Sequence, residues 1–228
     1  MSNQTITRFR DQRIVFNSGI RGRSIEIPSA SPLNYYQVIS RPREMPAVTI
    51  DGQLFIPDKT NRQLPLVIVL PGSLGVAPSH IAHAESLSGC GFATFILDSF
   101  GARHVTSTVA NQTRFSFAAS GYDVLAAYLV LADLPEIDAS RIGLQGHSRG
   151  GSAALTAATR CFADPVLGSG RGFAGVLAAY PWCGQQFVDP GVGDTVIRCL
   201  IGDGDEWCSP IQVQSHCQAI NLSGGQAS

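Results

Sequence analysis

The sequence predicts an α/β protein with a doubly wound, mostly parallel sheet. The first observation is that, from Leu66 onward, strand-like runs alternate with segments of helical periodicity, as in parallel strands joined by crossover helices. The second is that residues 66–70 are apolar throughout, as expected of a strand covered on both faces. The third is that 228 residues, 44% of them hydrophobic, suit one sizeable α/β domain better than two small ones.

The N-terminal part of the chain gives weaker signals than the rest. Residues 1–45 are of mixed polarity and contain several turn signals, so we expect an irregular N-terminal segment with one strand around residues 13–16. Residues 46–228 are expected to form the α/β domain. This domain opens with an edge strand over residues 47–56, where apolar and polar residues alternate.

The elements after this edge strand follow from apolar runs, helical periodicity and turn residues. Buried strands are expected at residues 66–70, 92–98, 141–145, 173–180 and 195–201. Helices are expected at residues 79–87, 118–133, 149–162 and 209–220. The last eight residues, 221–228, are rich in turn formers, and we expect no partner strand for them.

Charge and composition exclude several classes of function. The net charge is −1, which gives no field for holding a nucleic acid or an anionic membrane, and no apolar run approaches membrane-spanning length. The polar N-terminus shows no signal peptide, so we expect a cytoplasmic protein. Residues 170–175 match a glycine-rich dinucleotide motif in letters, but they precede a strand instead of following one, so no organic cofactor is expected.

The cysteines and histidines do not predict a metal site. None of the six cysteines has the spacing of a metal-binding or redox pair. His80 and His83 are spaced three residues apart on a predicted helix, but no obvious third ligand accompanies them, so no metal is expected. A disulfide among Cys183, Cys208 and Cys217 would require an exported protein, and the cysteines are otherwise interpreted as free thiols.

The functional prediction depends on the glycine-x-serine-x-glycine motif from Gly146 to Gly150. This motif follows an apolar run and opens a helix of small residues, which is the context of a nucleophile elbow. Such a turn presents the hydroxyl of Ser148 above the sheet, at the positive end of the following helix. The backbone N–H of Arg149 is then expected to donate to an oxyanion. The alternative interpretation is an ordinary strand-to-helix turn.

Two further loops are expected at the edge of the sheet where the parallel strands end. A glycine-bearing loop follows residues 66–70, and the N–H of Ser73 is expected to be the second oxyanion donor, with Leu74 as the alternative. The loop after residues 92–98 carries Arg103 and His104, which we take as candidate substrate contacts because open α/β sheets bind ligands at this edge. Arg103 would attract an anionic substrate, or else brace its loop.

Together these segments resemble the dienelactone hydrolase-like members of the α/β-hydrolase superfamily. The resemblance covers about residues 50–220 and rests on residues 70–75, 98–103, 146–151, 180–183 and 201–207. It implies an α/β-hydrolase fold, serine-dependent hydrolysis of small carboxylic esters or lactones, and an acid at Asp205, with Asp203 as the alternative. The family's best-known enzyme uses a cysteine nucleophile where this chain has Ser148, so the resemblance favours an esterase-like relative.

The resemblance also implies a catalytic histidine in a loop after one further strand, and the sequence does not supply it there. His216 lies within the predicted helix after the acid, so we expect a fold that lacks its last strand and helix, as in a fragment of a longer hydrolase, with weak or no activity. The alternatives are recruitment of His104 as the base, since His147 faces the wrong way for an elbow, and a catalytically silent binding or interaction protein. The oligomeric state is not predicted.

Overall fold

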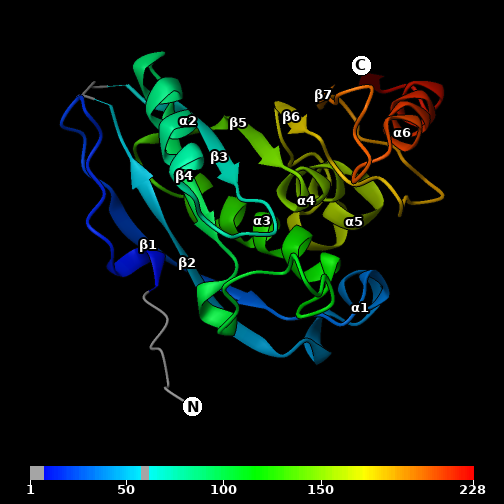
Figure 1. Cartoon of the computed structure of the whole chain (residues 1–228), viewed down its shortest axis with the longest axis horizontal. Coiled ribbons are helices and arrows are strands. Elements are labelled where there is room, and N and C mark those ends of the chain that lie inside the picture. The colour runs from blue at the N-terminus through cyan, green and yellow to red at the C-terminus, as the bar shows by residue number, and fades with distance from the viewer. Residues whose placement is uncertain (1–7, 58–61) are drawn as a thin grey trace.

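The computed structural model describes residues 8–57 and 62–228. Within them, the strands form one eight-stranded sheet in the order β1-β2-β4-β3-β5-β6-β7-β8 (Figure 1). The pairs β1–β2 and β2–β4 are antiparallel, whereas all neighbours from β4 to β8 are parallel, so the predicted doubly wound, mostly parallel sheet is confirmed. The strands are β1 (Arg23–Ala30), β2 (Ala47–Phe55), β3 (Leu64–Leu70), β4 (Ala93–Asp98), β5 (Ile137–His147), β6 (Gly175–Ala179), β7 (Val196–Leu200) and β8 (Gln226–Ala227).

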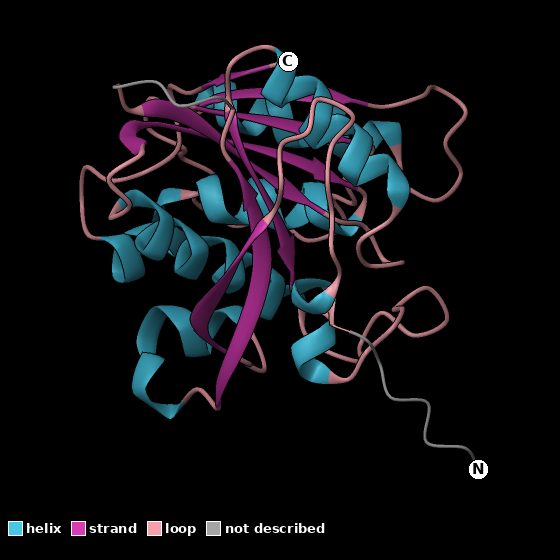
Figure 2. Cartoon of the chain, turned by 90° about the vertical axis from the view of Figure 1, so that its left-hand side faces the viewer, coloured by secondary structure: helices cyan, strands magenta, loops and turns pink. Residues whose placement is uncertain are grey.

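Helices lie on both sides of the twisted sheet (Figure 2). The α-helices are α1 (Tyr35–Ser40), α2 (Pro78–Gly89), α3 (Phe117–Ala132), α4 (Arg149–Ala158), α5 (Arg160–Leu167) and α6 (Pro210–Leu222). Short 3₁₀ turns are η1 (Phe9–Asp11), η2 (Pro42–Glu44) and η3 (Gly101–Arg103). In the part of the chain that the structure describes, no helix has the length and apolar character needed to cross a membrane.

The side chains of β3 alternate between two separate cores, as expected of a strand covered on both faces. Leu66, Ile68 and Leu70 belong to the main core, on the side of α3 and α4. Val67 and Val69 belong to a smaller core on the side of α2. The continuous apolar run that predicted this strand is therefore needed because the sheet has no solvent-facing side at this position.

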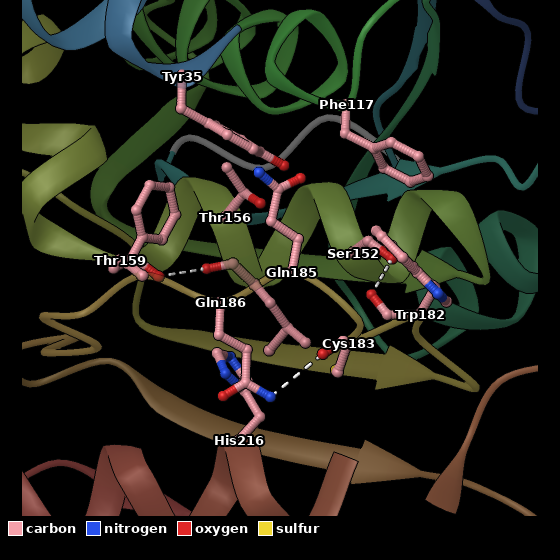
Figure 3. A pocket seen from close by; sticks show the side chains of 12 residues that line it. Tyr35, Phe117, Ser152, Thr156, Thr159, Trp182, Cys183, Gln185, Gln186 and His216 are labelled. Carbon is pink, nitrogen blue, oxygen red and sulfur yellow. Dashed lines mark hydrogen bonds between the residues drawn. The ribbon is translucent and has the colours of Figure 1, made fainter. Parts of the chain in front are cut away.

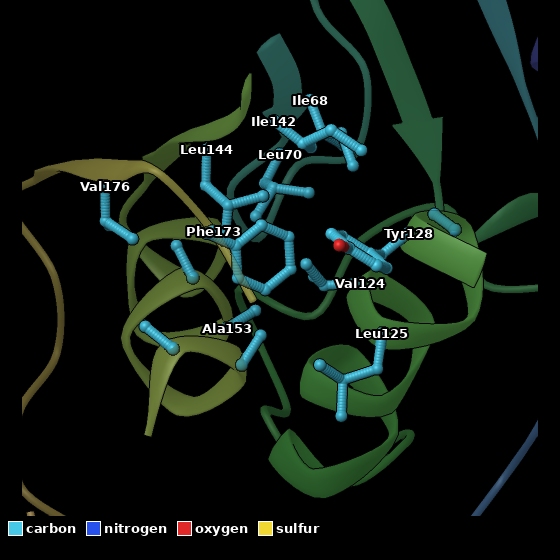
Figure 4. Packing of buried hydrophobic residues seen from close by; sticks show 14 of the residues in the cluster. Ile68, Leu70, Val124, Leu125, Tyr128, Ile142, Leu144, Ala153, Phe173 and Val176 are labelled. Carbon is cyan, nitrogen blue, oxygen red and sulfur yellow. The ribbon is translucent and has the colours of Figure 1, made fainter. Parts of the chain in front are cut away.

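The main core supports the turn between β5 and α4 (Figure 4). The ring of Phe173 packs edge-on against Tyr128 of α3, with ring centroids 5.3 Å apart. Leu144 of β5 and Ala153 of α4 are buried in the same cluster. Because strand and helix are both fixed by this packing, the turn that carries Ser148 stands on a rigid base.

The expectation of an irregular segment over residues 1–45 is wrong for much of the described part. Residues 23–30 form β1, an edge strand that pairs with β2 along its whole length, and residues 35–40 form α1. The strand expected around residues 13–16 is reduced to an isolated bridge between Val15 and Arg21. Pro28 concealed β1 in the sequence, although an edge strand tolerates a proline because one side of its backbone has no partner.

Two smaller differences concern the second half of the chain. The helix expected over residues 149–162 is divided at Thr159, whose backbone is extended, into α4 and α5. Gln226 and Ala227 pair in parallel with β7, so the prediction that residues 221–228 have no partner strand is wrong at these two positions. All six cysteines lie in the described residues and are free thiols.

Candidate active site

Ser148 occupies the turn between β5 and α4 in a backbone conformation that side chains rarely adopt. Its φ is 52° and its ψ is −117°. A positive φ is unfavourable for a residue with a Cβ atom, so the surrounding structure must hold it. The N–H of Ser148 donates to the carbonyl oxygen of Ala179 in β6 at 2.9 Å, and its own carbonyl accepts from the N–H of Ser152 at 3.0 Å. The half-buried side chain of Ser148 therefore lies in a strained turn between the end of β5 and the start of α4.

The two glycines of the motif allow the strand and the helix to approach closely. A Cβ atom on Gly146 would lie 2.3 Å from the carbonyl oxygen of Gly150, and one on Gly150 would lie 2.2 Å from the carbonyl oxygen of Leu70. Both contacts are with backbone, which cannot move aside as a flexible side chain can. The spacing of glycines around Ser148 is therefore required by the packing of α4 against β5 and β3.

One predicted oxyanion donor directly follows Ser148 in the chain, and the other belongs to a loop that lines the same cleft as Ser148. Arg149 is the first residue of α4, so its N–H has no helical acceptor and points along the positive end of the helix. Ser73 lies in the loop after β3, where its carbonyl accepts from the N–H of Thr108 at 2.7 Å and its hydroxyl accepts from the side-chain amide of Gln112 at 3.0 Å. These bonds fix the loop that contains the Ser73 N–H.

A cleft of about 440 Å³ brings together the residues predicted to be the nucleophile, the acid and the second oxyanion donor. It contains Ser148, Asp205 and Ser73, along with residues from the ends of several strands. Its lining is completed by Gly72, Leu74, Gly75, Ala77, Ser79, His80, Val109, His147, Tyr180, Trp207 and Cys208. The predicted alternative acid, Asp203, is exposed and is not among the residues of this cleft.

Asp205 lies in the loop after β7 and is half-buried. Its Oδ1 atom accepts hydrogen bonds from the backbone N–H groups of Trp207 at 2.9 Å and Cys208 at 2.8 Å. These bonds orient the carboxylate and occupy one of its two oxygens. Among the described residues, no histidine forms an ion pair with Asp205.

His104, which was predicted as an alternative base, and His216, the histidine that follows Asp205 in the sequence, both lie elsewhere. His104 is exposed at the end of η3 and does not line the cleft, so its proposed recruitment as base or substrate contact is wrong. His216 is buried on α6 and faces a separate cavity of about 20 Å³ beside α4, which Ser152, Trp182 and Gln186 also line (Figure 3). Neither ring nitrogen of His216 has a hydrogen-bond partner, and burial lowers its pKa.

Two histidines that sequence reasoning did not place in the site line the cleft instead. The ring of His147 packs against two rings of α2, with its centroid 5.1 Å from that of His80 and 4.9 Å from that of His83. The Nδ1 atom of His80 accepts a hydrogen bond from the N–H of Ala77 at 3.0 Å. Burial, followed by the nearby His147 ring, lowers the pKa of His80 to about 4, and burial also lowers the pKa of His147. Both imidazoles are therefore neutral near pH 7.

A helix that begins directly after the loop containing Ser73 is the signal that would have placed His80 here. The third residue of this helix, His80, lies close to the end of that loop, and both line the same cleft as Ser148. In the described residues, no three histidine, cysteine, aspartate or glutamate side chains gather in a way that would hold a metal ion.

The side chain of Arg103 does not reach the cleft. Its five N–H groups donate to Ser31, to the carbonyls of Ala30 and Ser99, and twice to Asp123, at 2.7 and 2.9 Å. The ion pair with Asp123 is buried. The prediction that Arg103 contacts an anionic substrate is therefore wrong, because no donor is left for a ligand, and the bracing alternative describes its place in the structure.

The guanidinium of Arg149 is also directed into the protein, away from any ligand. It donates to the carbonyls of Gln112, Phe115 and Ser116 and stacks on the rings of Phe115 and Phe117. Burial lowers its pKa to about 10. Because Gln112 also bonds Ser73, this side chain links the elbow helix to the loop after β3.

Comparison with known proteins identifies the fold. No family model matches the chain, and no curated protein matches its sequence. Among solved structures, m3DLH superposes with a TM-score of 0.66 at 17% identity, over 91% of this chain and 80% of its own. A Klebsiella pneumoniae protein assigned as a dienelactone hydrolase gives 0.62 at 15% identity, over 90% of this chain and 83% of its own. A dienelactone hydrolase-like promiscuous phosphotriesterase from metagenomic libraries gives 0.62 at 13% identity, over 91% and 80%. This chain therefore has the α/β-hydrolase fold of dienelactone hydrolase-like structures.

Proposed function

We propose that this protein is a serine-dependent hydrolase of small carboxylic esters or lactones, with Ser148 as the nucleophile. The observation that carries the proposal is the positive φ of Ser148 at a cleft that also contains Asp205. Such a conformation costs about 1–3 kcal/mol, and residues that bear this cost cluster at functional sites. The likeness in fold to a dienelactone hydrolase-like phosphotriesterase agrees with the proposal.

In the proposed reaction, the hydroxyl oxygen of Ser148 attacks the carbonyl carbon of the substrate and gives its proton to a base. The resulting oxyanion accepts hydrogen bonds from the N–H groups of Arg149 and Ser73. Collapse of this intermediate expels the alcohol, which takes up a proton, and leaves an acyl-serine. Water then attacks the acyl-serine, releases the carboxylic acid and restores the hydroxyl.

The rate of this reaction is expected to be low because the described residues place no imidazole on Asp205. His80 is a poor substitute: the bond from Ala77 occupies its Nδ1 atom, so the proton lies on Nε2, and its pKa of about 4 makes it a weak base. Without a base, a serine hydrolase loses several orders of magnitude in rate but keeps the contribution of its oxyanion hole. This arrangement also favours a second function, a protein that binds ligands in the cleft without turnover.

Covalent labelling separates the two functions. An alkyl fluorophosphonate is expected to add one phosphonyl group to the wild-type chain, with loss of fluoride, as measured by intact mass after prolonged exposure, because an unactivated Ser148 reacts slowly. Ser148→Ala is expected to abolish the adduct. Ser152→Ala is the matched control, because Ser152 lies one turn further along α4 with its hydroxyl bonded to the carbonyl of Trp182 at 2.8 Å. An unlabelled wild-type chain, or a labelled Ser148→Ala variant, would contradict the hydrolase and favour the binding protein.

A further inference from the structure

Large apolar side chains gather around the mouth of the cleft. Of the eleven exposed large apolar side chains in the described residues, four line this cleft: Leu74, Val109, Tyr180 and Trp207, with exposed fractions of 70%, 44%, 44% and 67%. They come from four different loops, which follow β3, η3, β6 and β7. Single exposed apolar residues are ordinary, whereas a group of them around a cavity indicates a surface that contacts an apolar ligand.

Tyr180 adds an independent observation. Its φ is 39°, so it is one of three non-glycine residues with positive φ in the described chain, together with Ser148 and His104. It directly follows β6 and lines the same cleft as Ser148. Strained residues persist only where the surrounding structure holds them, and two of them at one cleft indicate that the position of this aromatic ring matters there.

The charged groups of the cleft also favour a neutral ligand. Asp205 is the one aspartate, glutamate, lysine or arginine that lines it in the described residues, and the lowered pKa values of His80 and His147 keep both imidazoles neutral. The guanidinium groups of Arg103 and Arg149 are bonded within the protein. An anionic substrate would therefore meet a negative charge and find no positive partner.

We propose that the cleft selects neutral esters or lactones that carry an apolar, ring-containing group. It discriminates against substrates that carry a free carboxylate in addition to the ester or lactone group. This inference rests on the proposed function and specifies its substrate. The ring is expected to lie against Trp207 and Tyr180 at the mouth, while the carbonyl carbon lies at the Ser148 hydroxyl. A cleft volume of about 440 Å³ is within the range of small-molecule sites.

Three arylboronic acids test the selection. The boron of each can form a bond to the Ser148 oxygen, with the serine proton leaving to solvent. The three probes differ only at the para position of the ring. Phenylboronic acid is the neutral apolar probe, para-carboxyphenylboronic acid adds a negative charge, and para-carbamoylphenylboronic acid is a neutral group of the same size. Protection of Ser148 from fluorophosphonate labelling gives the affinity of each. The carboxyl probe is expected to bind about 5-fold more weakly than the carbamoyl probe, because its charge lies near Asp205.

Variants test the apolar contact. Trp207→Ala is expected to weaken phenylboronic acid about 3–10-fold, the usual contribution of an aromatic pair. Val188→Ala removes an exposed apolar side chain outside the cleft and is expected to change nothing. Equal affinities for the carboxyl and carbamoyl probes, or an unaffected Trp207→Ala variant, would overturn the inference.

The inference and the proposed function fail in different ways. If the fluorophosphonate labels Ser148 but no boronic acid protects it, the proposed nucleophile stands and the inferred selectivity is wrong. If Ser148 is not labelled at all, the proposed function is wrong and the inference is overturned with it.

Discussion

Two strands of the sheet, β4 and β7, end in similar aspartate loops at the same edge. The carboxylate of Asp98 accepts from the N–H groups two and three residues further on, Phe100 at 2.9 Å and Gly101 at 3.2 Å. Asp205, after β7, does the same with Trp207 and Cys208 at 2.9 and 2.8 Å. The local backbone chemistry of the two loops is therefore alike.

Their surroundings are different. Asp98 is buried, and both of its oxygens accept hydrogen bonds. A few residues later, Arg103 ties this loop to β1 and α3 through the buried pair with Asp123. In the loop after β7, by contrast, Asp205 is only half-buried and Trp207 is exposed, and both line the cleft.

The comparison shows that the edge of the sheet does not by itself determine which loop binds a ligand. In the loop after β4, both carboxylate oxygens of Asp98 and all five N–H groups of Arg103 are bonded within the protein. In the loop after β7, one carboxylate oxygen and an aromatic face are left for another molecule. Polar groups at a strand end are available for function only where the fold has not already paired them.

The largest expected effect concerns the stability contributed by the loop after β4. Arg103→Met would leave Asp123 buried without its partner, and we expect it to lower the free energy of unfolding by about 3–5 kcal/mol. Arg141→Ala is the control, since it removes a surface ion pair with Asp138 whose arginine is half exposed, and it is expected to change the free energy of unfolding little. Urea unfolding gives both values.

Labelling of Ser148 in the same Arg103→Met variant tests the other half of the comparison. Under conditions where the variant is folded, the labelling rate is expected to equal that of wild type, because the side chain does not line the cleft. A stable variant with slower labelling would show that Arg103 acts on the site after all.

The sequence was sufficient to predict the parts of the site that depend on local geometry. The elbow requires glycines at two fixed positions around Ser148, and the structure shows which backbone atoms impose them. The parallel sheet likewise follows from apolar runs such as residues 66–70, because strands covered on both faces cannot carry polar side chains.

Tertiary pairings could not be predicted in this way. Arg103 was interpreted as a substrate contact because its partner, Asp123, lies twenty positions further on in α3, and nothing in the local sequence links them. His80 was treated as an ordinary helix residue because its neighbour in the cleft, His147, belongs to β5. The edge strand β1 was missed because edge strands tolerate the proline and polar residues that resemble a loop.

The second prediction concerns the pH dependence of stability that the buried His80 of the cleft should cause. The folded chain holds the pKa of His80 at about 4, against 6.5 for an unperturbed histidine, because of burial and the neighbouring His147. Between these values the unfolded chain binds a proton that the folded chain does not, so the free energy of unfolding should fall as the pH is lowered from about 6.5 to about 4. The His80 contribution is on the order of 3 kcal/mol at most.

Urea unfolding across this range of pH, compared between variants, isolates the histidine. His80→Gln removes the titration and keeps a side-chain acceptor for the N–H of Ala77, so its stability should depend less steeply on pH than that of wild type. His104→Gln is the matched control, because it makes the same substitution at an exposed histidine outside the cleft. Equal slopes for wild type and His80→Gln would show that His80 does not stay neutral in the folded protein.

The smallest expected effect comes from making one substitution in both aspartate loops. Asp98→Asn replaces a buried acceptor oxygen by an amide donor that faces the N–H of Gly101, and should cost about 1–3 kcal/mol of stability. Asp205→Asn keeps one acceptor oxygen for Trp207 and Cys208, so its unfolding free energy should change by about 0.5 kcal/mol or less.

Asp205→Asn also removes the negative charge of the cleft, so it should restore most of the roughly 5-fold affinity lost by the carboxyl-bearing boronic acid. Asp203→Asn, on an exposed residue outside the cleft, should restore none, and equal recovery in both variants would mean that the general negative charge of the loop, and not Asp205 itself, repels the anion.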